Sequence, residues 1–239
     1  MKARIAMLLV ALACAGAAKA QLVVFDNSHS ANATWYSDFK TRLATWGYTV
    51  EARTTPLMDS GDADVIVILP EDAFLSDTDP YTPEEAAWLM DYVNRGGGLL
   101  AAVCPNDSYW AQITEIMDVF GISEANTATD PVHYDVFAPH PIFDGVTELG
   151  DDFIYCTSLT ASGPSSAVGG DGSLDYIAVY QPLPAGTGGA VWVSEYYMMH
   201  SAGLDDYDNA IFLQNTMAWL SSGSTSTAES SWSAVKALY

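Results

Sequence analysis

One stretch, residues 82–105 (TPEEAAWLMDYVNRGGGLLAAVCP), most constrains what this chain can fold into. It predicts a helix with Thr82 as the N-cap, Pro83 in the first helical position, and two glutamates in the first turn, where carboxylates suit the helix dipole. Residues 96–98 are three glycines, which end the helix and permit the positive φ of a tight reversal. Residues 99–103 are all apolar, as a strand covered on both faces requires. A helix that feeds such a strand is half of a βαβ crossover.

The rest of the chain extends this pattern into a doubly wound sheet. Strands are predicted at 22–26, 48–51 and 64–70, and helices at 34–46 and from about 106 to 120. Three further strand candidates, at 152–156, 174–180 and 190–194, are separated by Gly/Ser-rich turns, which favours a more antiparallel C-terminal edge. A last helix at 208–220 offers apolar residues to the core, namely Ile211, Phe212, Met217, Trp219 and Leu220.

The two ends of the sequence are expected to lie outside the folded domain. Residues 1–20 have a basic start, a short apolar segment and an A-x-A cleavage site, so we expect a signal peptide and export. A lipoprotein with its lipid on Cys14 is the second interpretation, because residues 11–13 match the usual lipobox poorly. Residues 21–222 then form one α/β domain, and residues 223–239 form a flexible linker and a short tail.

Charge narrows the possible partners. All acidic residues lie after the predicted signal peptide and three basic ones lie within it, which leaves five basic against thirty acidic residues, a net charge of −25. Nucleic acid and anionic lipid are therefore disfavoured, because few cations remain to neutralise phosphates. No segment after the signal peptide is long and apolar enough to predict a membrane span.

Ligands of open α/β sheets bind outside the carboxyl ends of the strands, and polar residues follow several of the predicted strands. These candidates for ligand binding are Asp26, Ser28, His29, Glu71 and Asn106. A nucleophile–base–acid triad is the other possibility, with Cys104, His200 and either Glu195 or Asp205.

Two features of the sequence weaken the triad. Pro105 removes a backbone N–H that commonly helps to form an oxyanion hole, and no small residues flank Cys104 as in strand–nucleophile–helix turns. A buried structural cysteine is the default, and pairing of Cys104 with Cys156 stays open.

The acidic clusters lack the pattern of a calcium loop, so neither a metal nor a cofactor is predicted.

Several segments resemble the class I glutamine amidotransferase-like superfamily, in its secreted branch related to gliding-motility ABC auxiliary proteins and to ThuA-like proteins. They are FDNSHS near the start, ADVIVILP, EEAAWLMDYVNRGGGLLAAV, HPIFDGV and DNAIFLQNTMAWL, and together they span about residues 22–222. The resemblance implies a flavodoxin-like three-layer α/β sandwich, mostly parallel, with Cys104 near the place of the family's nucleophile.

Active members of that superfamily carry a His-x-Glu pair later in the chain, whereas here Glu195 precedes His200 and no His-x-Glu occurs. We therefore expect an exported, non-catalytic domain that binds a small ligand, such as a saccharide, or a cell-surface protein. Trp110, Tyr196 and Tyr197 could stack on a sugar, although core packing is the default for each. The alternative is a cysteine-dependent hydrolase or amidase that uses Cys104 and His200.

Overall fold

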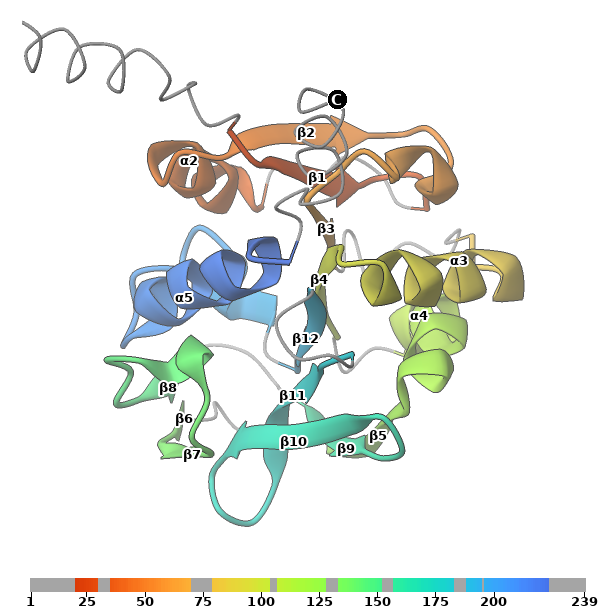
Figure 1. The fold of residues 1–239 in the computed structure, drawn as a ribbon. Helices are drawn as coiled ribbons and strands as arrows, with labels where there is room; N and C mark the ends of the chain where they lie inside the picture. Colours follow the sequence, from red (N-terminus) through yellow and green to blue (C-terminus); the bar gives the residue numbers. More distant parts are fainter. Residues whose placement is uncertain are drawn as a thin grey trace, which may run out of the picture.

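The chain is built around one mixed β-sheet (Figure 1). The structure, a computed structural model, describes residues 20–29, 35–69, 79–103, 107–127, 133–151, 157–182, 188–194 and 196–223. In the ten-stranded sheet the main strand order is β2-β1-β3-β4-β12-β11-β10-β7, with β9 and β5 joined through β11. The α/β class is thus confirmed, with parallel N-terminal strands and an antiparallel C-terminal edge.

The predicted strands at 22–26, 48–51 and 64–70 and the apolar run at 99–103 form parallel strands. The predicted strand at 190–194, expected at the antiparallel edge, instead pairs in parallel on one side and antiparallel on the other. The strands of the parallel part are β1 (Leu22–Asp26), β2 (Thr49–Arg53), β3 (Val65–Ile68), β4 (Gly98–Ala102) and β12 (Gly189–Val193). All except the edge strand β2 are buried along their whole length, because helices cover both faces. Parallel pairing aligns the carboxyl ends of these strands along one edge of the sheet.

The antiparallel part is larger than the sequence pattern predicted. It consists of β5 (Ile122–Thr127), β7 (Val136–Phe137), β9 (Thr157–Ala161), β10 (Ser165–Gly170) and β11 (Asp175–Tyr180). Strands β6 (His133–Tyr134) and β8 (Leu149–Gly150) pair separately. Neither β9 nor β10 contains a continuous apolar run, because β10 includes glycines and serines and β9 includes threonines, so the apolar pattern does not predict them. The predicted strand at 152–156 lies outside the described residues.

Helices complete the three layers. Helices α2 (Ser37–Thr45) and α5 (Asn209–Ser221) cover one face of the sheet, and α3 (Pro83–Asn94) and α4 (Asp107–Phe120) cover the other (Figure 1). Three short 3-10 helices lie in the connections: η1 (Leu57–Ser60), η2 (Pro141–Phe143) and η3 (Tyr196–Met199). None of the helices in the described part of the chain has the length and apolarity that a membrane crossing needs.

Helix α3 begins as the sequence predicted. The Thr82 hydroxyl accepts a hydrogen bond from the Glu85 backbone N–H, and the Glu85 carboxylate accepts one from the Thr82 backbone N–H, which completes a capping box. Pro83 occupies the first turn. This cap matters beyond the helix, because it fixes the Glu85 side chain at the carboxyl edge of the sheet.

The three glycines after α3 serve different purposes. Only Gly96 has a positive φ, of 107°, and so ends the helix as predicted. Gly97 and Gly98 are required by close packing instead: a Cβ on Gly97 would overlap the Tyr92 ring, and one on Gly98 would lie 2.8 Å from the Leu220 backbone oxygen of α5. The sheet and α5 therefore touch where β4 begins.

One residue of the last helix, Ile211, is not buried as predicted: it is 42% exposed. Phe212, Met217 and Leu220 are buried as expected, and Trp219 is partly buried against the core. Apolar residues occur on all sides of this helix, so periodicity alone does not identify the buried face. The predicted signal peptide and the tail from residue 224 onward lie outside the described residues.

Candidate functional site at the carboxyl edge of the parallel strands

The strand order places a topological switch point between β1 and β3. After β1 the chain moves outward to β2 and then returns to the other side of β1 as β3. Open α/β sheets bind their ligands where the order reverses in this way. Asp26, the last residue of β1, lies at this point, and the predicted residues Ser28 and His29 follow it directly.

Asp26 is buried and holds its neighbours in place. Its Oδ1 accepts hydrogen bonds from the Ser28 backbone N–H at 3.1 Å and the Ser28 hydroxyl at 2.7 Å. Its Oδ2 accepts one from the hydroxyl of Tyr81, also buried, at 2.7 Å. The carboxylate thus fixes the turn after β1 and ties it to the segment that precedes α3.

His29 makes contacts through both ring nitrogens. Its Nδ1 lies 3.0 Å from the Asp79 backbone carbonyl oxygen, and its Nε2 lies 2.9 Å from Oε1 of Glu85. A carbonyl oxygen can only accept, so Nδ1 carries a hydrogen. The ring also packs on Tyr81, with 4.0 Å between the ring centroids. Both side chains of the His29–Glu85 pair are more than nine-tenths buried.

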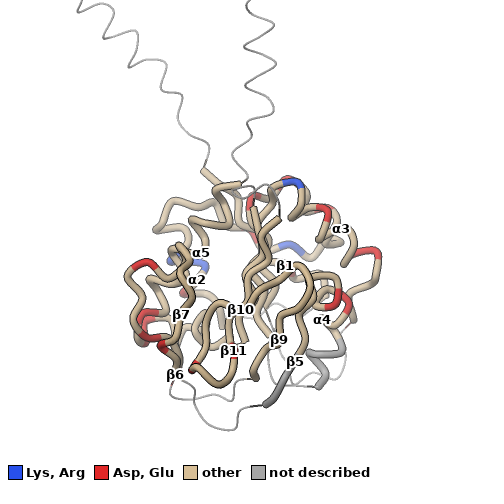
Figure 2. Tube along the Cα trace, turned by 60° about the horizontal axis from the view of Figure 1, so that its bottom comes forward, with Lys and Arg blue, Asp and Glu red and all other residues tan. Residues whose placement is uncertain are grey.

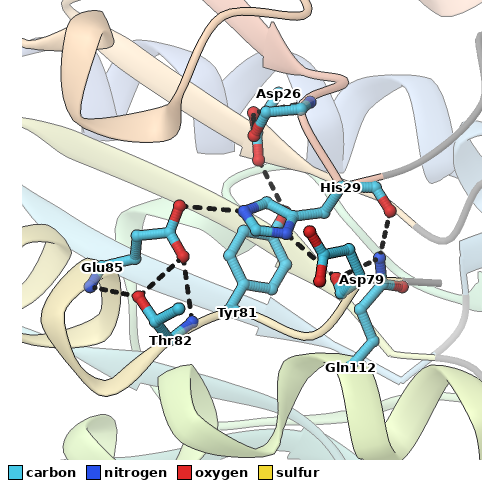
Figure 3. A network of polar contacts seen from close by, with 8 residues as sticks. Asp26, His29, Asp79, Tyr81, Thr82, Glu85 and Gln112 are labelled. Carbon is cyan, nitrogen blue, oxygen red and sulfur yellow. Dashed lines mark hydrogen bonds and ion pairs between the residues drawn. The ribbon is translucent and has the colours of Figure 1, made fainter.

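The Glu85 carboxylate lies between His29 and Thr82 and contacts both (Figure 3). Burial alone would raise the pKa of its carboxyl, but hydrogen bonds from the Thr82 backbone N–H, the His29 ring and the Thr82 hydroxyl outweigh burial and lower that pKa below its ordinary value. Nε2 of His29 thus faces a carboxylate at the N-terminus of α3, where negative charge also suits the helix dipole.

Gln112 of α4 links the group to the second helix on this face. Its side-chain amide donates to the His29 backbone carbonyl at 2.6 Å, and the Gln112 backbone carbonyl accepts from the Tyr81 backbone N–H at 3.0 Å. We call Asp26, Ser28, His29, Tyr81, Thr82, Glu85 and Gln112 the switch-point network. In this arrangement both ring nitrogens of His29 contact oxygen atoms and both carboxylates accept from several donors. The network is therefore suited to holding backbone segments in place rather than to transferring protons.

The lowered pKa of Glu85 predicts a pH dependence. Because its folded pKa lies below its unfolded value, the carboxylate contributes stability that is fully present above the unfolded value, about 4.5, and is lost as the pH falls through the folded value. The difference in free energy of unfolding between the unmodified protein and Glu85→Gln should therefore be constant near pH 6 to 7 and shrink below about pH 4.5. Urea unfolding at a series of pH values measures it, and a difference that stays constant down to pH 3 would contradict this assignment.

His200, the predicted general base, lies elsewhere. Its ring stacks on Tyr197 with 4.5 Å between centroids and packs edge-on against Trp35. Its Nδ1 accepts a hydrogen bond from the Ala202 backbone N–H at 3.1 Å, which leaves the hydrogen of the neutral ring on Nε2. Burial lowers the pKa of His200, and Asp38 opposes this in part. Among the described residues no contact joins His200 to the switch-point network.

Five residues of the sequence predictions lie outside the described residues: Glu71, Cys104, Asn106, Cys156 and Glu195. The triad of Cys104, His200 and Glu195 and the Cys104–Cys156 pairing therefore stay predictions. Of the aromatic residues proposed to stack on sugar, Tyr196 is buried and Tyr197 is half-buried under His200, so both pack as the default interpretation expected.

The structure places Asp26, Ser28 and His29 together at the end of β1 and adds partners that sequence reasoning missed. Tyr81, Glu85 and Gln112 were not among the candidates. The T-x-x-E capping signature at Thr82 could have indicated that the Glu85 carboxylate points back toward the start of α3. Nothing local indicates that its second partner is His29, which lies 56 positions earlier in the sequence.

Comparisons by sequence assign the chain to no family and give no significant match. No family model matches it, and no curated protein matches it significantly.

Solved structures show what the fold is similar to. The mmIFT52 N-terminal domain superposes with a TM-score of 0.68 at 15% identity, over 84% of this chain and 98% of that one. The cytoplasmic protein STM1381 from Salmonella typhimurium LT2 gives a TM-score of 0.60 at 13% identity, over 84% and 99%. A glutamine amidotransferase from Thermotoga maritima gives 0.55 at 9% identity, over 85% and 99%. The chain is thus structurally similar to class I glutamine amidotransferase-like folds, as the motifs predicted, and identities this low concern the fold alone.

Proposed function

We propose that this protein is an exported, non-catalytic binding domain with an amidotransferase-like fold, which binds a small ligand at the carboxyl edge of β1 and β3. The observation that carries the proposal is the switch-point network itself. Buried polar side chains from β1, from the segment before α3, and from α3 and α4 converge where α/β sheets bind ligands. Burying polar groups costs free energy unless each is paired, and here the pairing fixes the backbone at the binding edge.

The way these groups are engaged supports the non-catalytic part of the proposal. Asp26 and Glu85 each accept several hydrogen bonds, and both nitrogens of His29 contact acceptors. A general base needs a lone pair that is available to accept a proton from its substrate. In this arrangement the carboxylate oxygens of the network already accept hydrogen bonds from neighbouring groups of the protein. We assign the network a positioning role: it holds the turn after β1, which contains the half-buried Ser28, against the start of α3.

A neutral polyol is the ligand chemistry that fits best. The predicted charge of −25 for the exported chain repels anions, which disfavours phosphorylated ligands and nucleotides. Fixed backbone groups and hydroxyls, such as those of the turn at residues 26–29, can exchange hydrogen bonds with sugar hydroxyls without needing a charged partner. We therefore propose a saccharide as the ligand class.

A thermal-shift screen tests this proposal. Exported protein beginning at Gln21 is heated with a panel of mono- and oligosaccharides, with sugar phosphates as the charged comparison. A ligand at 100 times its Kd adds about 2.7 kcal/mol, which for a domain of this size raises Tm by about 5–10 °C. Glu85→Gln should reduce the shift, whereas Glu84→Gln, which alters the exposed neighbouring residue, should preserve it. No shift with any saccharide, or an equal shift in both variants, would contradict the proposal.

A further inference from the structure

A tyrosine, a histidine and a glutamate contact one another outside the switch-point network. The hydroxyl of Tyr207 lies 2.9 Å from Nε2 of His133, and Nδ1 of His133 lies 3.4 Å from Oε1 of Glu148. The rings of His133 and Tyr207 also pack edge to face, with 4.5 Å between their centroids. All three side chains are partly exposed, so a reagent in solution can reach them.

Asp208 ties the loop before α5 to the segment before β8. Its Oδ2 accepts hydrogen bonds from the backbone N–H and the hydroxyl of Thr147, both at 2.7 Å, and its backbone N–H donates to the Glu148 carbonyl at 3.1 Å. The hydrogen bonds from Thr147 hold the pKa of the Asp208 carboxyl below its ordinary value. The pairing of β6 with β8 places His133 opposite Gly150. Backbone contacts therefore position all three members of the group.

Tyr207 has an unusual backbone conformation. Its φ of 45° is the only positive value at a non-glycine residue in the described part of the chain. Bulky residues seldom adopt this left-handed region, because the Cβ atom then lies too close to the backbone. Outliers of this kind are found most often at functional sites, where the surrounding structure holds them in place. At this position the contacts of Asp208, the next residue, provide that support.

The order of the three groups is the one that activates a nucleophile. A nucleophile is activated when it hydrogen-bonds to a base and a third group orients that base. The ionised carboxylate of Glu148 can only accept, which favours the hydrogen of the neutral His133 ring on Nδ1. The lone pair of Nε2 then faces the Tyr207 hydroxyl and can take its proton.

The charge of the surroundings limits which reagents can react there. No Lys or Arg occurs between residues 96 and 235, a stretch that contains 17 Asp and Glu residues. In Figure 2 red, acidic segments accordingly lie beside β6 and β7, and no blue, basic segment lies among them. This field repels anions, which disfavours phosphorylated donors. The stretch also contains no lysine amine that would compete for an acyl group.

We propose that Tyr207 accepts an acyl group from neutral activated esters, with His133 as the general base and Glu148 as the residue that positions it. The Tyr207 oxygen attacks the carbonyl carbon, and its proton passes to Nε2 of His133. The bond between the carbonyl carbon and the leaving oxygen then breaks, and the leaving group takes the proton from His133. The products are an O-acyl tyrosine and an alcohol or phenol. This modification involves no residue of the switch-point network, so it does not depend on saccharide binding.

Acetylation of the exported chain by 4-nitrophenyl acetate tests the proposal, because peptide mass spectrometry gives the rate at each tyrosine separately. Tyr48 is the internal reference: it is half-buried, and its hydroxyl lies 3.4 Å from the Ser221 hydroxyl rather than beside an imidazole. His133→Gln keeps an acceptor for the Tyr207 hydroxyl but has no basic nitrogen. It should slow acetylation of Tyr207 about tenfold or more and leave the rate at Tyr48 unchanged.

Two further variants separate positioning from charge. Glu148→Gln removes the carboxylate that orients the imidazole, so it should slow acetylation of Tyr207 about fivefold. In the His133→Gln background it should have no further effect, because Glu148 acts only through the ring. Asp135→Asn, the matched control, removes an exposed carboxylate two positions from His133 and should leave the rate unchanged.

The ratio of the rates at Tyr207 and Tyr48 is the quantity compared, since unfolding of a variant would expose both tyrosines and would not lower it selectively. An unchanged ratio in His133→Gln would overturn the proposal. Equal slowing by Glu148→Gln and Asp135→Asn would overturn it as well, because the effect would then come from local charge and not from the orientation of the ring.

Discussion

Replacing Glu85 with alanine should lower the free energy of unfolding by about 3 kcal/mol, which corresponds to a fall in Tm of about 6–12 °C for a chain of this size. The substitution removes the carboxylate that contacts His29 Nε2 and the Thr82 backbone N–H, and it leaves the buried imidazole without that partner. Most of the expected loss comes from that unpaired group, because removing one partner of a buried pair costs more than the pair itself contributes.

Two comparisons separate the charge from the packing. Glu85→Gln keeps the shape and some hydrogen bonds, so it should cost less than alanine, whereas Glu84→Ala, at the exposed neighbour, should change stability by about 0.5 kcal/mol or less. His29→Ala combined with Glu85→Ala should cost less than the sum of the single substitutions, with a coupling of about 1 kcal/mol or more. Urea unfolding monitored by circular dichroism measures all of these. Equal losses for Glu84→Ala and Glu85→Ala would contradict the assigned contacts.

The second large effect is expected at Gly98, where β4 begins under α5. A Cβ at this position would lie 2.8 Å from both the backbone oxygen and the Cβ of Leu220, so α5 would have to move away from the sheet. Gly98→Ala should therefore destabilise the protein by about 2 kcal/mol, and Gly98→Val by more. Differential scanning calorimetry measures the loss.

Gly61 provides the matched control. It has a helical φ of −65°, and an added Cβ would meet only the Trp88 ring, at an ordinary 3.6 Å. Gly61→Ala should be neutral or stabilise the protein by up to about 1 kcal/mol, because alanine restricts the unfolded chain. A Gly98→Ala protein as stable as Gly61→Ala would contradict the close contact between β4 and α5.

The sequence predicted the parallel part of the fold well, because its signals are local. The capping residues Thr82 and Pro83, the glycine that ends α3 and the apolar run of β4 each act within a few residues. The antiparallel part was harder to predict, since β10 is rich in serine and glycine and its pairing with β7 depends on residues more than thirty positions away. Ile211 was assigned to the core because α5 is apolar nearly all round, and only packing shows which side is covered.

For the candidate site, the sequence indicated polar residues at the end of β1 but not the residues that contact them. The rule that ligands bind at the carboxyl ends of strands drew attention to Asp26, Ser28 and His29, which the structure places at the end of β1. Ligand binding by these residues stays a prediction. What these residues do depends on Tyr81 and Glu85, which reach them from the start of α3. Contacts between residues more than fifty positions apart leave no periodic pattern in a single sequence. The sequence therefore indicates a ligand site after β1 but not the contacts that hold its residues in place.

The measurement that most directly tests the central claim is a titration of the ¹⁵N-labelled exported protein with pooled saccharides, followed by amide NMR. The account predicts that resonances of residues 26–29 and 79–85 shift in a saturable manner, that those of β7 and β10 stay in place, and that the saccharides are recovered unchanged. Shifts confined to other parts of the molecule, no shift with any pool, or turnover of a saccharide would contradict it.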